Sequence, residues 1–227
     1  MANKNISIDD LMPIEEEDIG SAIQAVVCFC LDTSYSMQGK KIKALTEVVN
    51  NFILRNKNDI CNSNMLNLSI VTFGGIEPKI VQNFANIKSV DEQEFKANGG
   101  THMSDGVKLA ISLIKEEKQI LSEKGVSTYK PILIIMSDGK PDESIDGISM
   151  ELKTLSNKKK INTYCIAYNS DNDSEKDKKD ALDALQKLTN KRVETANEFN
   201  IDDLFLKLSR SMSNMSRSFA GDIEDIL

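Results

Sequence analysis

The chain has 227 residues, of which 40% are hydrophobic and 28% are charged, so it can bury a core and is not predominantly disordered. Its 28 lysines and arginines against 35 aspartates and glutamates give a formal net charge of −7, which argues against nucleic acid as a partner because phosphate-backbone binding depends on clustered cations. No apolar stretch approaches the roughly 20 residues needed to cross a bilayer, and residues 1–19 lack the apolar segment of a signal peptide, so we expect a cytoplasmic protein with no membrane partner.

The predicted elements begin with residues 25–31 (AVVCFCL), a continuous apolar run typical of a strand that is covered on both faces. Apolar residues then recur at three- and four-residue steps over 42–53, which predicts a helix packed on the sheet. The runs 65–73 and 80–84, separated by two glycines, predict a hairpin with an antiparallel strand at the sheet edge. A glycine-containing loop over 98–101 then leads into a helix that runs towards Lys124.

The second half alternates strands and helices in the same way. We expect a strand over 131–136, a helix over 148–155 and a strand over 161–167. An exposed charged segment over 169–179 follows, and then a helix over 181–188, a short strand over 192–195 and a final helix over 201–215. The four cysteines lack metal-site spacing, and three of them lie in apolar runs, so we expect buried, reduced thiols.

This alternation predicts a doubly wound α/β domain. We expect a mostly parallel sheet of about six strands, with one antiparallel edge strand and helices on both faces, in which ligands bind beyond the carboxyl ends of the strands. The domain should cover residues 21–218, after a polar segment over 1–20 and before an acidic tail over 219–227.

Oxygen-bearing side chains follow the first predicted strand, at Asp32, Ser34 and Ser36. In a doubly wound sheet, the loop that holds Thr101 and the strand end that holds Asp138 reach the same edge. Hydroxyl and carboxylate oxygens suit Mg²⁺, or alternatively Mn²⁺ or Ca²⁺, better than Zn²⁺. A site with few direct carboxylates leaves a coordination position open for an oxygen from outside the chain.

These five residues resemble the metal-ion-dependent adhesion site of von Willebrand factor A (VWA) domains, whose fold is similar to the Rossmann fold. The resemblance implies that Ser34, Ser36 and Thr101 contact the metal, and that Asp32 and Asp138 act directly or through waters. It also implies that an Asp or Glu of a protein partner completes the metal's ligand shell. The expected function is therefore metal-dependent binding of a protein.

Short motifs of the sequence are similar to those of bacterial TerY-like VWA proteins, which are associated with tellurium-resistance and stress-response gene clusters. The similar segments are 31–34 (LDTS), 99–101 (GGT) and 137–141 (SDGKP). This resemblance implies a kinase-like or phosphatase-like protein partner and a scaffolding role in a phosphorylation module.

Two other functions stay open. One is an oligomer-forming structural protein in which the cation only stabilises loops, and the other is a Mg²⁺-dependent phosphohydrolase. Against an enzyme, Asp32 is not followed by a second aspartate two residues later, and no lysine or arginine has an evident pairing with the site. We therefore expect no catalytic residues and no enzymatic activity.

Residues beside the cluster allow alternative interpretations. Tyr35 stands where many relatives carry a small residue, and its ring is expected to shape or shield the metal. His102 either reports on the site through its charge or only begins a helix. Met37 and Met103 form either an apolar rim for a partner or part of the core. The end of the chain, 221–227, is either an unstructured tail or a segment that docks on another chain.

Overall fold

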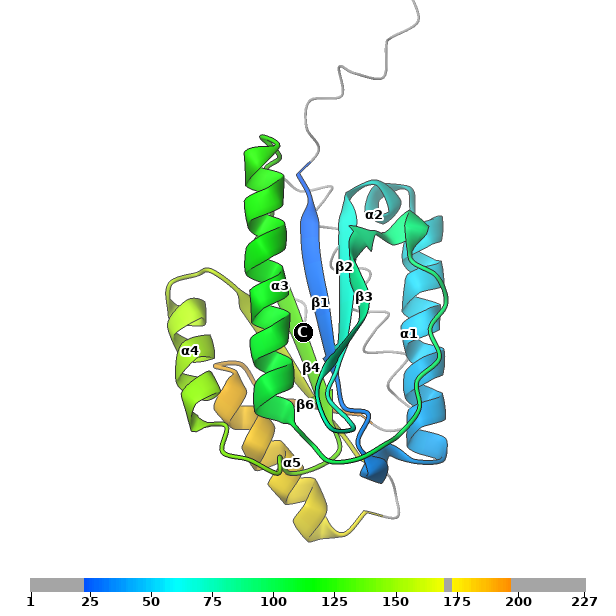
Figure 1. Cartoon of the computed structure of the whole chain (residues 1–227), viewed down its shortest axis with the longest axis vertical. Coiled ribbons are helices and arrows are strands. Elements are labelled where there is room, and N and C mark those ends of the chain that lie inside the picture. The colour runs from blue at the N-terminus through cyan, green and yellow to red at the C-terminus, as the bar shows by residue number, and fades with distance from the viewer. Residues whose placement is uncertain (1–22, 170–172, 197–227) are drawn as a thin grey trace, which may run out of the picture.

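The computed structural model describes residues 23–169 and 173–196, in which helices cover both faces of a six-stranded sheet (Figure 1). The strand order is β3-β2-β1-β4-β5-β6. Of these strands, β3 pairs antiparallel with β2, and every other neighbouring pair is parallel. The strands are β1 (Ala25–Leu31), β2 (Leu66–Thr72), β3 (Lys79–Asn86), β4 (Ile132–Ser137), β5 (Asn162–Tyr168) and β6 (Glu194–Ala196). The predicted doubly wound sheet with one antiparallel edge strand is confirmed.

The helices form two layers. One layer holds α1, whose apolar side chains pack on the sheet face that includes Phe29; the other holds α3, α4 and α5, which pack on the opposite face (Figure 1). The helices are α1 (Lys40–Asn58), α2 (Ile60–Met65), α3 (Met103–Glu123), α4 (Asp146–Asn157) and α5 (Glu175–Leu188), with short 3-10 turns η3 (Tyr35–Met37) and η4 (Ile87–Ser89). Within the described ranges, no helix is both long and apolar enough to span a bilayer.

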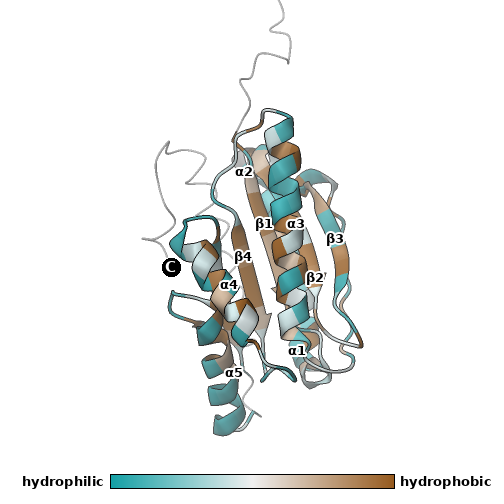
Figure 2. Ribbon diagram, turned by 60° about the vertical axis from the view of Figure 1, so that its left-hand side comes forward, coloured by the Kyte–Doolittle hydropathy of each residue, from teal (hydrophilic) through white to brown (hydrophobic). Residues whose placement is uncertain are grey.

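The central strand β1 is buried on both faces, which explains its continuous apolar sequence. Its alternate residues belong to the two core layers, with Phe29 packed against Phe52 of α1 at 4.9 Å between ring centroids. Figure 2 shows the hydrophobic colour along β1 and β4 and hydrophilic colour over much of α3 and α5. Cys28, Cys30 and Cys165 are free thiols on the α3 side, and burial raises the pKa of Cys28 to about 12. For these three, the prediction of buried, reduced thiols is confirmed.

The chain reverses its direction of travel across the sheet between β1 and β4. From β1 it moves outward through β2 and β3, then returns to β4 on the other side of β1 and moves outward through β5 and β6. The pairing of Leu31 with Met136 brings the carboxyl ends of β1 and β4 side by side. Ligands of open α/β sheets bind at this kind of switch point, just beyond the strand ends.

The structure corrects several predicted boundaries. Helix α5 begins at Glu175, six residues before the predicted start, because its first turn carries charged residues with no apolar period; Ser174 caps it by accepting the N–H of Asp177 at 3.1 Å. The short helix α2 was not predicted, because its polar sequence (ICNSNM) shows no amphipathic pattern. Residues 1–20, the final helix over 201–215 and the tail over 219–227 lie outside the described residues.

Candidate metal centre

Asp32 is the first residue after β1, and its side chain is fully engaged and buried. Its backbone N–H donates to the carbonyl of Met136 at 2.9 Å, which fixes it beside β4. One carboxylate oxygen, Oδ1, accepts the N–H of Ser34 at 2.8 Å, and the other, Oδ2, accepts the hydroxyl of Ser137. Burial raises the pKa of Asp32 to about 6, although the hydrogen bonds from Ser137 and Ser34 lower it. Asp32 therefore ties the loop after β1 to the end of β4.

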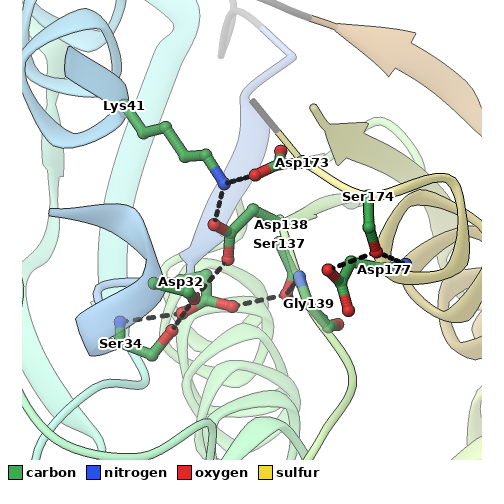
Figure 3. A network of polar contacts seen from close by, with 10 residues as sticks. Asp32, Ser34, Lys41, Ser137, Asp138, Gly139, Asp173, Ser174 and Asp177 are labelled. Carbon is green, nitrogen blue, oxygen red and sulfur yellow. Dashed lines mark hydrogen bonds and ion pairs between the residues drawn. The ribbon is translucent and has the colours of Figure 1, made fainter. Parts of the chain in front are cut away.

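Three of the predicted residues form a chain of oxygen contacts across the ends of β1 and β4. The hydroxyl oxygens of Ser34 and Ser36 lie 3.0 Å apart, and the Ser36 hydroxyl donates to Oδ1 of Asp138 at 2.7 Å. Turn η3 positions the two serines, closing with a hydrogen bond from the Met37 N–H to the Ser34 carbonyl at 3.0 Å. Figure 3 shows Asp32, Ser34 and Asp138 converging at this edge of the sheet.

The loop that holds Thr101 is joined to the loop after β1 by two backbone hydrogen bonds. The N–H of Asn98 donates to the carbonyl of Thr33 at 2.8 Å, and the N–H of Tyr35 donates to the carbonyl of Gly99 at 2.9 Å. Thr101 itself is 7% exposed and lies two residues after Gly99. The backbone therefore places Thr101 close to the loop of residues 32–36, here called the serine loop, as predicted.

Glycines make this close approach between loops possible. A Cβ on Gly74 would lie 2.2 Å from the carbonyl oxygen of Thr33. Gly99 has a positive φ of 65° and is so close to Gly75 that a Cβ on Gly99 would lie 2.5 Å from the Cα of Gly75. The turn after β2 therefore supports both loops of the site from one side.

The connection after β4 fixes the Thr101 loop from the other side. The N–H of Thr101 donates to Oδ2 of Asp142 at 2.7 Å, and the N–H of Ser104 donates to Oε1 of Glu143 at 2.7 Å. These carboxylates accept hydrogen bonds from N–H groups at the start of α3, a favourable position for negative charge. Sequence reasoning missed both acidic residues, because nothing in the spacing shows which loop they meet.

The donor set fits a hard divalent cation. Oxygens bound to neighbouring positions of Mg²⁺ lie roughly 3 Å apart, because each is about 2.1 Å from the metal in octahedral geometry. The contacts of Ser36 with Ser34 and Asp138, at 3.0 and 2.7 Å, have about this spacing. No group of three or more Asp, Glu, His or Cys side chains suited to a metal is found among the described residues. That the five residues ligate a metal stays a prediction.

Lys41 contacts this site, contrary to the interpretation that no lysine or arginine pairs with it. Its ammonium lies 2.6 Å from Oδ2 of Asp138 and 2.8 Å from Oδ1 of Asp173 (Figure 3). Burial lowers the pKa of Lys41, but the hydrogen bonds to Asp138 and Asp173 outweigh this effect and raise the pKa above its ordinary value. Lys41 belongs to the first turn of α1. Its side chain is long, and the sequence does not indicate which carboxylates it contacts.

The residues beside the cluster have distinct positions. Met37 and Met103 are fully buried, so the core interpretation is correct and the apolar rim is wrong. Tyr35 is 66% exposed, with its side chain on the outside of the serine loop. His102 precedes α3 as its N-cap residue, and its Nδ1 lies 3.5 Å from Oε2 of Glu143.

A family model described as "von Willebrand factor type A domain" matches residues 27–211, which is most of the chain. The chain belongs to the von Willebrand factor type A (VWA) family. VWA domains often mediate adhesion between proteins.

Curated relatives are similar over part of their length. Inter-alpha-trypsin inhibitor heavy chain H4 of Sus scrofa is 29% identical over 131 residues, which are 55% of this chain and 13% of that protein. Heavy chain H1 of Bos taurus is 28% identical over 136 residues, which are 57% of this chain and 14% of that protein. The chain therefore spans only a small part of the curated relatives it matches.

Solved structures share the fold at low identity. The pilus adhesin SpaC of Lactobacillus rhamnosus GG, in an open conformation, has a TM-score of 0.65 and 14% identity over 84% of this chain and 30% of that chain. The domain of the type V pilus tip protein Mfa5 of Porphyromonas gingivalis has a TM-score of 0.61 and 12% identity over 89% of this chain and 99% of that chain. These likenesses support the VWA fold.

Proposed function

We propose that this VWA domain binds a divalent cation, Mg²⁺ or alternatively Mn²⁺ or Ca²⁺, and uses it to bind an acidic residue of a protein partner. The observation that carries the proposal is the chain of oxygen contacts from Ser34 through Ser36 to Asp138, next to the buried Asp32. With Thr101, these residues would hold the cation. The bound cation would supply a concentrated positive charge that attracts a carboxylate from outside.

The chain's own residues suit this role by donating little negative charge. Ser34, Ser36 and Thr101 offer neutral hydroxyls, so only two carboxylates, Asp32 and Asp138, offset the cation's charge directly. A site that is not saturated by its own carboxylates keeps its attraction for an acidic partner. Asp32 has a hydrogen bond to each of its two carboxylate oxygens and no exposed surface, which suits a structural ligand better than a nucleophile. We therefore propose binding without catalysis.

Exposed apolar side chains beside the site suit contact with a protein. Tyr35 is 66% exposed and Ile76 is 95% exposed. Both adjoin Gly99: the N–H of Tyr35 donates to its carbonyl, and Gly75, the residue before Ile76, forms a β-bridge with it. A partner that places an apolar side chain next to its acidic residue would bury this surface while its carboxylate reaches the cation.

The identity of the partner follows only from resemblance. We propose a cytoplasmic kinase-like or phosphatase-like protein, in a stress-response module like that of TerY-like proteins, because segments 31–34, 99–101 and 137–141 are similar to theirs.

An affinity capture from cytoplasmic extract tests the binding function. Wild-type protein should capture a partner in Mg²⁺ and lose it in chelator, and Thr101→Ala should capture none under either condition. Asp105→Asn is the control, because Asp105 pairs with Lys108 on the exposed surface of α3. The same captured proteins with all variants, with and without Mg²⁺, would instead favour the structural role of the cation.

A further inference from the structure

The ion pair between Lys41 and Asp138 is enclosed by the fold. The side chain of Lys41 is 11% exposed, that of Asp138 is fully buried and that of Asp173 is 17% exposed. Charges in such a place are screened less by water and salt than charges on the surface. The ammonium therefore changes the electrostatic potential at Asp138 more than an exposed lysine would.

The two oxygens of Asp138 face different groups. Oδ1 accepts the hydroxyl of Ser36, and Oδ2 accepts the ammonium of Lys41. An ammonium has no lone pair and cannot ligate a metal, so Lys41 stands behind Asp138 as a fixed charge next to the site. Figure 3 shows Lys41 between Asp138 and Asp173, which precedes α5.

Lys41 offsets part of the negative charge at the site. Asp32, Asp138 and Asp173 are acidic, and Asp142 adds a carboxylate that accepts the N–H of Thr101, whereas Lys41 places a positive charge against Asp138 and Asp173. Without Lys41, the carboxylate of Asp138 would act on the cation with no ammonium at its second oxygen. The cation would then bind more tightly, and the loaded site would be more negative and less attractive to an acidic partner.

We propose that Lys41 tunes the affinity of the metal site, because its charge weakens the hold on the cation and keeps the loaded site attractive to a carboxylate. This inference rests on the proposed metal-dependent binding function. Asp173 opposes Lys41, because its carboxylate shares the ammonium with Asp138 and adds a negative charge to the site. Removing the charge of Lys41 and removing the charge of Asp173 should therefore change the affinity for the metal in opposite directions.

Titration calorimetry with Mg²⁺ alone tests this pair. Lys41→Met removes the charge but keeps a long apolar side chain, and it should tighten Mg²⁺ binding by roughly tenfold, since a unit charge acts strongly at this depth. Asp173→Asn should weaken Mg²⁺ binding severalfold. Lys41→Arg keeps the charge and should bind Mg²⁺ like the wild type, as should the control Lys108→Met, whose lysine is 58% exposed in its side chain.

Melting curves provide a readout that does not depend on a partner. In chelator, Lys41→Met leaves Asp138 and Asp173 without this ammonium, so its melting temperature should fall below that of the wild type. Mg²⁺ should then raise the melting temperature of Lys41→Met by more than it raises that of the wild type. If Lys41→Met does not fold, the affinities of Asp173→Asn and Lys41→Arg still decide the question.

The outcomes separate this inference from the proposed function. A wild-type protein that binds no divalent cation would overturn both. A wild type that binds Mg²⁺ with the same affinity as Lys41→Met would overturn the role of Lys41 alone. Weaker Mg²⁺ binding by both Lys41→Met and Asp173→Asn would show that the ion pair only holds the fold together, which also overturns the proposed role.

Discussion

The hydroxyl of Ser36 donates to Oδ1 of Asp138 at 2.7 Å, although 102 residues separate them in the sequence. The contact joins the loop after β1 to the end of β4 at the switch point of the sheet. Ser36 is exposed as a residue, so truncating its side chain opens no cavity in the core.

Ser36→Ala should weaken Mg²⁺ binding by at least tenfold and cost about 1.5 to 3 kcal/mol of stability, the usual range for a hydrogen bond to a charged group, because Oδ1 of the buried Asp138 loses this donor. Calorimetry and denaturant unfolding measure the two effects. Ser144→Ala is the matched control, because the Ser144 hydroxyl also donates to a carboxylate, that of Asp146, on the exposed surface. Equal Mg²⁺ affinity in Ser36→Ala and Ser144→Ala would show that Ser36 does not contribute to metal binding.

The stabilisation by Mg²⁺ should depend on pH through Asp32, whose pKa burial raises to about 6. Without metal, folded Asp32 keeps its proton up to about pH 6, whereas unfolded Asp32 loses it near pH 4. Its contribution to stability, at most about 3 kcal/mol, is therefore present below about pH 4 and is lost as the pH rises through 6. Mg²⁺ binds the carboxylate, so it should restore stability only above about pH 6.

Melting temperatures with Mg²⁺ and with chelator, from about pH 5 to about pH 8, measure this dependence. The difference between the two curves should grow with rising pH in the wild type. Asp32→Asn lacks both the titrating group and a carboxylate of the site, so the difference between its two curves should be small and should not change with pH. A difference that is constant across this range in the wild type would contradict the prediction.

Gly74→Ala should destabilise the domain and weaken Mg²⁺ binding together. Its Cβ would lie 2.2 Å from the backbone oxygen of Thr33, so the serine loop must move, at a cost of about 1 to 3 kcal/mol. Gly147→Ala in α4 is the contrasting control, because its Cβ would meet nothing within 4 Å; it should stabilise by up to about 1 kcal/mol through helix propensity. Unfolding and calorimetry of both variants check the pair, and a stable Gly74→Ala variant would show that the loop yields freely.

Tyr35→Ser and Ile76→Ser should weaken partner capture severalfold and leave Mg²⁺ affinity unchanged, because these side chains flank the site without belonging to it. Ile60→Ser is the control: Ile60 is 82% exposed but begins α2, which precedes β2 and so lies at the opposite edge of the sheet. Capture yields and calorimetry distinguish the two surfaces. Equal loss of capture in all three variants would contradict a partner surface around Tyr35.

Much of the fold could be predicted because a buried parallel strand needs apolar residues on both faces. The run 25–31 matches β1 at both ends for this reason. Helix α5 was predicted too short, because its charged first turn is specified by the cap at Ser174 and by exposure to water, not by apolar spacing. A pattern of burial predicts the parts of an element that are buried and little about its exposed ends.

The candidate site could be predicted in part for a related reason. Residues at the ends of adjacent parallel strands must meet, and the structure brings Asp32, Ser34, Ser36 and Asp138 into one network. Lys41 could not be predicted, because its contact with Asp173 depends on how α1 and the connection after β5 meet in three dimensions.

The switch point between β1 and β4 also bears on how the molecule assembles. Residues of the first three strands lie on one side of this seam and residues of the last three on the other, so neither half contains both Asp32 and Asp138. The cation site can form only after the two halves have paired along β1 and β4. During refolding, uptake of Mg²⁺ should therefore lag behind the first formation of helices and report the moment when the whole sheet is complete.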